Sequence, residues 1–198
     1  MIKYFTEQQT HNLQFEDYLK MQYHSHSSLK NDIGGFQKEF RMTDKIALGK
    51  QVDEILTSGH PDINSPHYRK AMNIAKAIKE KFGDKLISSF KCQVSYFGYM
   101  ESFGMRLKIK GRPDWIISGR AVLDLKVTAE SLKKVESLID FMGYDNQLFN
   151  YRGLSGCRNL FLLFYSTKDE KAMLIDRTLK VGWNSENWWS EKIMMHGE

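Results

Sequence analysis

Cysteine and long apolar segments are both scarce in this sequence. Its 198 residues include two cysteines, Cys92 and Cys157, which lie far apart and form no CxxC pair. A cysteine-ligated zinc or redox motif is therefore excluded, and we expect two buried, reduced thiols. No apolar run approaches the ~20 residues that a membrane-spanning helix needs. The polar N-terminus does not resemble a secretory signal, so we expect a cytoplasmic protein, in the host cell if a phage encodes it.

The remaining composition is typical of a globular protein. Hydrophobic residues make up 41% and charged residues 27% of the sequence. The net charge of +5 suits a polyanionic partner without requiring one. The sequence has no internal repeat and no low-complexity linker. We therefore expect one domain over 1–198, with an N-terminal helical arm (1–40), a core (41–178) and a C-terminal tail (179–198).

The hydrophobic periodicity predicts an α/β fold. Helices are expected near 8–21, from Thr43 or Asp44 to 57, over 67–82 with Gly83 as C-terminal cap, over 130–151 with a break near Gly143, and over 183–195. Strands are expected at 90–96, 105–110, 121–127, 160–165 and 173–176. This order indicates one mixed sheet of about five strands flanked by helices. His24 and His26 are expected to be solvated loop residues.

Two carboxylates and a lysine stand out in the middle of the chain. Asp124 and Lys126 are two residues apart on the strand expected at 121–127, so they point to the same face. Asp124 interrupts an apolar run, where a buried charge is costly unless it is paired or holds a metal. Asp114 follows Pro113 at the end of the preceding strand. A structural ion pair would explain Asp124 and Lys126, but all three residues together indicate a Mg²⁺ site for phosphodiester cleavage.

At these residues the sequence resembles the PD-(D/E)xK nuclease superfamily, whose core is restriction-endonuclease-like. It is most similar to the phage lambda exonuclease and RecE group, with RecB-type domains further off. Three motifs carry the resemblance over residues 90–165: Lys110-Gly-Arg-Pro-Asp114, Asp124-Leu-Lys126, and Gln147 followed four residues later by Tyr151. The resemblance implies a Mg²⁺- or Mn²⁺-dependent deoxyribonuclease. It also implies an exonuclease that digests linear double-stranded DNA in recombination or repair and leaves a strand for a single-strand annealing protein.

The resemblance also implies roles for individual residues. Asp114, Asp124 and the main-chain carbonyl of Leu125 would hold one or two metal ions, while Lys126 and Gln147 would act on the attacking water or the phosphate. The positions expected to contact nucleic acid are Tyr151, Tyr144, Gln93, Arg112 and Arg152. No Ser/His or Cys/His arrangement suggests a covalent intermediate.

Two positions depart from the pattern of these relatives. Gly49 is followed after four residues by Asp53, where relatives often have histidine, and Gln93 stands where they often have glutamate. Asp53 is either a further Mg²⁺ ligand or a helix-surface acid. Three alternatives follow: an exonuclease, an endonuclease of the same superfamily, or a catalytically weakened module that binds DNA or a protein. Ring-shaped homo-oligomers occur among the relatives, and the candidate interface residues here are Trp183, Trp188 and Trp189.

Overall fold

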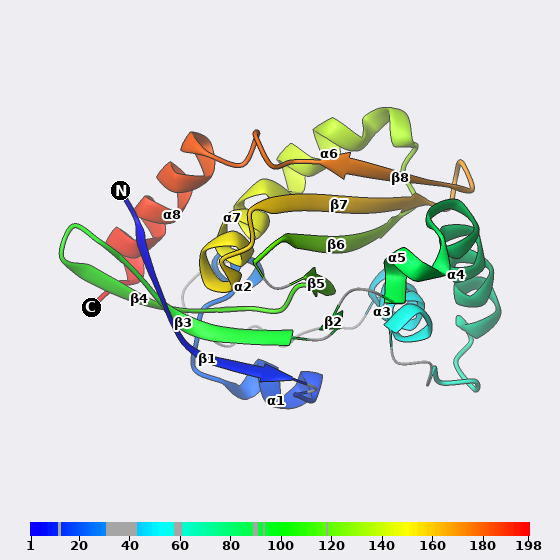
Figure 1. Ribbon diagram of the computed structural model, residues 1–198, viewed down its shortest axis with the longest axis horizontal. Coiled ribbons are helices and arrows are strands. Elements are labelled where there is room, and N and C mark those ends of the chain that lie inside the picture. Colours follow the sequence, from blue (N-terminus) through cyan, green and yellow to red (C-terminus); the bar gives the residue numbers. More distant parts are fainter. Residues whose placement is uncertain (12, 31–42, 58–60, 89–90, 93, 118) are drawn as a thin grey trace.

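The computed structural model describes residues 1–11, 13–30, 43–57, 61–88, 91–92, 94–117 and 119–198, and it is a mixed α/β structure with two sheets (Figure 1). The strands are β1 (Lys3–His11), β2 (Lys91–Cys92), β3 (Val94–Ser102), β4 (Met105–Gly111), β5 (Trp115–Ile117), β6 (Ala121–Thr128), β7 (Asn159–Ser166) and β8 (Lys171–Asp176). The helices are α1 (Phe15–Lys20), α2 (His26–Lys30), α3 (Asp44–Thr57), α4 (Tyr68–Phe82), α5 (Asp84–Ser88), α6 (Val135–Met142), α7 (Tyr144–Ser155) and α8 (Trp183–His196), with a 3-10 turn at Leu132–Lys134. None of the described helices is long and apolar enough to cross a membrane.

The larger sheet has the strand order β2-β5-β6-β7-β8. β6 and β7 run parallel, whereas the other neighbouring strands are antiparallel. The two faces of β6 are as predicted: Leu123 and Leu125 pack with residues of α3 and α4, and Val122 packs with residues of α7. Because side chains alternate along a strand, Asp124 and Lys126 lie on the same face as Val122.

The prediction of a single sheet was wrong. β3 and β4 pair with β1 in a separate sheet of order β1-β3-β4, and the strand expected at 90–96 is divided between β2, which pairs with β5, and β3. Residues Val94–Gly98 are all buried, so their alternation does not mark a solvent face. The outer side of β3 is covered by α1, where the Tyr18 ring lies 6.0 Å from that of Phe97.

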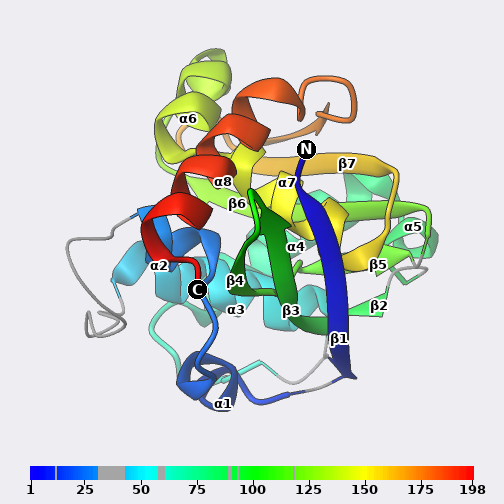
Figure 2. The same cartoon turned by 90° about the vertical axis from the view of Figure 1, so that its left-hand side faces the viewer.

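The helix predicted near 8–21 was also wrong in its first part. Residues Lys3–His11 form the edge strand β1, and only Phe15–Lys20 are helical. β1 lies close to β3 because Gly98 has no side chain: a Cβ there would lie 2.1 Å from the main-chain oxygen of Phe5. Pairing with a strand ninety residues away therefore determines the conformation of this segment. Figures 1 and 2 show α1 at one end of the smaller sheet, beside β1.

Most helix predictions were confirmed. α3 and α4 occupy the expected ranges, Gly83 follows α4 with φ 82°, and Gly143 separates α6 from α7 with φ 66°. The C-terminal helix α8 packs into the core through Trp189, whose indole Nε1 donates a hydrogen bond to the carbonyl of Asn146. Cys157 is a free, buried thiol as expected. The side chain of Cys92 lies outside the described residues.

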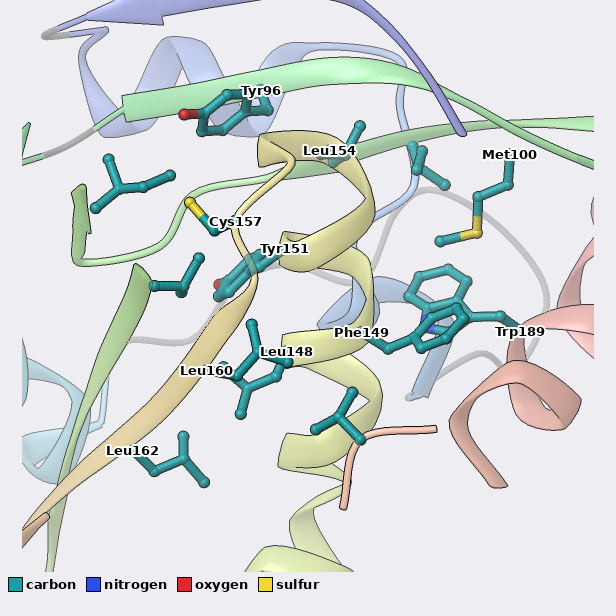
Figure 3. Close-up of a cluster of buried hydrophobic side chains, with 14 of the residues drawn as sticks. Tyr96, Met100, Leu148, Phe149, Tyr151, Leu154, Cys157, Leu160, Leu162 and Trp189 are labelled. Carbon is teal, nitrogen blue, oxygen red and sulfur yellow. The ribbon is translucent and has the colours of Figure 1, made fainter. Parts of the chain in front are cut away.

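Helix α7 lies between the two sheets and is buried on several sides. Figure 3 shows Leu148 pointing toward Leu160 of β7, Phe149 toward Trp189 of α8, and Leu154 toward the strands of the smaller sheet. A helix that is packed on several sides has little freedom to shift. The polar side chains that α7 presents at its remaining face are therefore held in fixed positions.

Candidate active site

Three polar side chains meet where the end of β4 approaches β6. Asp114 lies between β4 and β5, and its carboxylate Oδ2 accepts a hydrogen bond of 2.6 Å from the backbone N–H of Leu125. Leu125 separates Asp124 from Lys126, and these two form an ion pair on one face of the strand. Asp124 is only 2% exposed. The chain thus brings the two acids and the lysine together at one place.

A fourth charged residue, Asp53, joins this group from helix α3. Its Oδ1 is buried and accepts no hydrogen bond from the described residues. Burial raises the pKa of Asp53 from 3.8 to about 7; Arg112 opposes the shift, whereas Asp124 and Glu54 add to it. Burial, Asp124 and Asp53 likewise raise the pKa of Asp114, and Lys126 and the Leu125 N–H offset only part of this. Burial is the larger cause of both shifts, and the mutual repulsion of the carboxylates adds to it.

Lys126 is held as a charged ammonium. Burial alone would lower its pKa, but the neighbouring Asp124, Tyr144 and Asp114 raise the pKa above its ordinary value. The Tyr144 ring packs 4.6 Å from the ammonium nitrogen. At neutral pH this group therefore acts as a hydrogen-bond donor and a positive charge, not as a base.

These side chains open into a pocket of about 380 Å³. Of the residues predicted from the sequence, those that line it are Asp53, Arg112, Asp114, Asp124, Leu125, Lys126, Gln147 and Tyr151. Within the described part of the chain, no group of three or more His, Cys, Asp or Glu side chains is arranged so that it could hold a metal ion. The pocket wall carries the acids Asp53, Glu54, Asp114 and Asp124 and the basic residues Lys50, Lys110, Arg112 and Lys126.

Gln147 and Tyr151 form a short hydrogen-bonded chain from α7 to the loop that precedes Asp114. The Gln147 Nε2 donates to the Tyr151 hydroxyl at 2.8 Å, and this hydroxyl donates to the carbonyl of Arg112 at 3.2 Å. Gly111 makes room for the ring, because a Cβ there would lie 2.9 Å from it. The Tyr151 ring is buried, so in this structure it supports the backbone between Gly111 and Asp114.

The other predicted contacts with nucleic acid lie elsewhere. Tyr144 is next to Lys126 but is absent from the pocket lining. Arg152 donates a hydrogen bond of 3.0 Å to the carbonyl of Val181 and stacks on Phe149, which directs it away from the pocket. Gln93 lies outside the described residues.

Sequence reasoning missed the wall that the N-terminal arm contributes. Tyr18 and Leu19 of α1, and Ser25, His26 and Ser27 around the start of α2, all line the pocket. The prediction of a solvated His26 was wrong, because its ring packs 5.2 Å from that of Trp188 and is 5% exposed. Burial, with Lys126 and Lys30, lowers the His26 pKa to about 3, so the ring is neutral. Nothing in the local pattern of this segment indicated that it folds against the core.

Asn150 was missed as well, although its spacing from Gln147 could have indicated a place beside the site. It follows Gln147 by three residues, on the same side of α7 as Tyr151. Its Nδ2 donates to the carbonyl of Lys110 at 3.0 Å, and the residue is fully buried. A buried side-chain amide usually has a hydrogen-bond partner, as Asn150 does here.

We expect Asp53→Asn to stabilise the metal-free protein at pH 8 and not at pH 4. The Asp53 pKa is raised in the folded state. The contribution of this group to the free energy of unfolding is therefore fully present below the unfolded pKa of 3.8 and is lost as pH rises through about 7. Removing the charge should raise the free energy of unfolding at pH 8 by about 1–2 kcal/mol and the melting temperature by roughly 2–8 °C. Calorimetry in EDTA at both pH values measures this. An equal change at both pH values would contradict the assignment.

Comparison with known proteins supports the fold. No family model matches the sequence, and no curated protein matches it. A crystal structure of a proposed exonuclease from Eubacterium rectale is similar with a TM-score of 0.66 and 22% identity, over 94% of this chain and 84% of that one. A phage-related exonuclease from Haemophilus somnus 129PT has a TM-score of 0.41 and 15% identity over 89% and 99%, which is too distant to support an argument. The chain therefore has the fold of the Eubacterium rectale protein.

Proposed function

We propose that this chain is a metal-dependent nuclease that hydrolyses phosphodiester bonds in DNA. The observation that carries the proposal is the meeting of Asp114, Asp124 and Lys126 at one pocket. Acids that bind a hard cation, next to an amine that can contact a phosphate, form a donor set for phosphoryl hydrolysis. The Eubacterium rectale protein of the same fold is itself named as a proposed exonuclease, which supports this function.

The residues fit a divalent cation such as Mg²⁺ or Mn²⁺. Burial and neighbouring carboxylates raise the pKa values of Asp114 and Asp53, an effect that a bound cation would offset, and the Asp53 Oδ1 is a buried oxygen without a hydrogen bond from the described residues. Asp114, Asp124 and the main-chain carbonyl of Leu125 would hold one or two ions, with Asp53 as a further ligand. An open site of few carboxylates suits Mg²⁺, because this ion keeps several waters.

Each residue has a separate role in the proposed reaction. A bound divalent ion supplies a more acidic water and stabilises negative charge on the scissile phosphate. Lys126, fixed by Asp124, would donate hydrogen bonds to the attacking water or the phosphate. Gln147 uses its Nε2 on Tyr151, which leaves its Oε1 to orient the water. The Arg112 guanidinium, at the pocket wall, would bind a phosphate oxygen.

Within this class, we propose a phage-type exonuclease that acts on linear double-stranded DNA. It would serve recombination or repair, with a single-strand annealing protein as its partner. The three motifs at 110–114, 124–126 and 147–151 support this choice, because they resemble the lambda exonuclease and RecE group. An endonuclease of the same superfamily would share these residues. A catalytically weakened module is less well supported, because Asp53 belongs to the pocket lining and its buried Oδ1 has no hydrogen bond from the described residues.

The test is a nuclease assay on linear duplex, covalently closed circular DNA and single strands, with Mg²⁺ and with EDTA. Degradation of the linear duplex should require Mg²⁺, and the closed circle should stay intact. Asp124→Asn should lower the rate at least about 100-fold, because it removes one charged ligand of the metal. Calorimetry should show Mn²⁺ binding that this variant loses. A wild-type protein that binds Mn²⁺ but cuts none of the DNAs would favour the weakened module, and cleavage of the circle would favour an endonuclease.

A further inference from the structure

Lys110 is a buried cation whose side-chain hydrogen bonds go to one short helix and to the residue that follows it. Lys110 lies near the end of β4 and is 5% exposed. Burial lowers its pKa to about 8, so its ammonium group is charged at neutral pH. Its ammonium donates to the carbonyls of Tyr18 at 2.8 Å, Met21 at 3.0 Å and Leu19 at 3.3 Å. These are carbonyls at the C-terminal end of α1, which have no partners within the helix. An ammonium has three N–H donors, so all of them are used.

Helix α1 depends on such external contacts. It has six residues, and an isolated helix of this length is not stable in water. Its buried contact is Tyr18, whose ring lies 4.7 Å from the Lys110 ammonium nitrogen and 6.0 Å from the ring of Phe97. The next attachment along the chain is His24, which exchanges backbone hydrogen bonds with β4 at 2.9 and 2.7 Å. Lys110 is therefore a charged link between the core and the wall of the pocket that α1 forms.

The same helix covers Arg112. The guanidinium carbon of Arg112, a residue just beyond the end of β4, lies 5.9 Å from the centre of the Tyr18 ring. Tyr18, Asp53, Asp114 and Glu16 all act electrostatically on this guanidinium, which is itself part of the pocket lining. A displacement of α1 would remove the ring against which Arg112 packs and would open the pocket on the side of Tyr18 and Leu19.

We propose that Lys110 is a positioning residue: its three hydrogen bonds, the latch, hold α1 in place as a wall of the pocket. The Tyr18 ring of α1 in turn keeps Arg112 oriented toward the substrate phosphate. This inference rests on the proposed nuclease function. Lys110 does not serve as a phosphate ligand, because its three donors are occupied by carbonyls and a phosphate would have to displace α1 to reach them. The latch acts on substrate binding through the helix and through Tyr18, and the metal ligands are untouched.

The test compares Lys110→Met with Lys108→Met, a control on the same strand whose side chain is exposed. The rate of hydrogen exchange of the amides in residues 15–21 measures how firmly α1 is held, and it does not require nuclease activity. One of these amides is the Tyr18 N–H, which donates to the Gln14 carbonyl at 3.0 Å. In Lys110→Met, exchange there should accelerate at least tenfold. For linear duplex DNA, KM should rise about tenfold while kcat changes less than threefold. Lys108→Met should change neither quantity.

Unchanged exchange in Lys110→Met would overturn the latch, and a lower kcat with an unchanged KM would overturn the positioning role. If Lys110→Met does not fold, Lys110→Arg is the second variant, because a guanidinium keeps the charge but holds its N–H groups in one plane and does not reproduce the tetrahedral directions of the ammonium donors. Wild-type exchange in Lys110→Arg would likewise reject the latch. A wild-type protein without any nuclease activity would reject the proposed function, while the exchange measurement would still decide whether Lys110 holds α1.

Discussion

Lys126→Met should lower the rate of Mg²⁺-dependent DNA cleavage by at least about 100- to 1,000-fold, the usual effect of removing one preorganised donor from a polar active site. Methionine has a similar length and shape but no charge. The Lys126 ammonium is fixed by Asp124 on one side and the Tyr144 ring on another, so no movement is needed for it to meet the phosphate or the water. Single-turnover rates on linear duplex, compared with wild type at saturating Mg²⁺, measure the loss.

Lys126→Met also leaves Asp124 buried without its partner, which typically costs about 3–5 kcal/mol. A loss of activity could then reflect unfolding. The double variant Asp124→Asn/Lys126→Met separates the two effects, because it removes both charges. Its melting temperature should recover toward that of wild type while cleavage stays abolished. More than a tenth of the wild-type rate in a folded Lys126→Met variant would reject the assigned role.

The centre of the site could be predicted because local rules determine it. Asp124 and Lys126 share a face through strand alternation, and Gln147 and Tyr151 share a face through helix periodicity. An acid inside the apolar run of β6 indicated a special environment, and the structure shows Asp124 paired with Lys126 at 2% exposure. The ranges of α3 and α4 followed from their apolar spacing and from glycine at the end of α4.

The surroundings of the site could not be predicted, since they depend on contacts between distant segments. β1 is largely polar and exposed, and it becomes a strand only because β3 offers an unpaired edge and Gly98 permits close approach. Lys110 follows the inward-facing Ile109, so alternation predicts a solvated side chain. The structure instead buries it under α1, where its bonding partner Tyr18 lies 92 residues earlier in the chain. The walls of the pocket thus come from non-local packing that no short motif records.

Arg177 is a further buried charge that no sequence pattern indicated. It follows β8, is 3% exposed, and donates to both carboxylate oxygens of Asp145 and to Glu136 at 2.7 Å. Asp145 lies in the first turn of α7 and Glu136 in α6, so one guanidinium joins the two helices at the Gly143 break to the segment before α8. Because α7 carries Gln147, Asn150 and Tyr151, this network fixes the helix that supports the pocket.

Arg177→Met should therefore destabilise the whole fold by about 3 kcal/mol, because it leaves Asp145 partly buried without its bidentate partner. For a chain of this size the melting temperature should fall by roughly 6–12 °C. Lys180→Met is the matched control: Lys180 also approaches Glu136, at 3.9 Å, but its side chain is 64% exposed, and such a pair contributes about 0–1 kcal/mol. Urea unfolding of both variants measures the difference. Equal, small changes in the two would show that α6 and α7 are held by their apolar contacts alone.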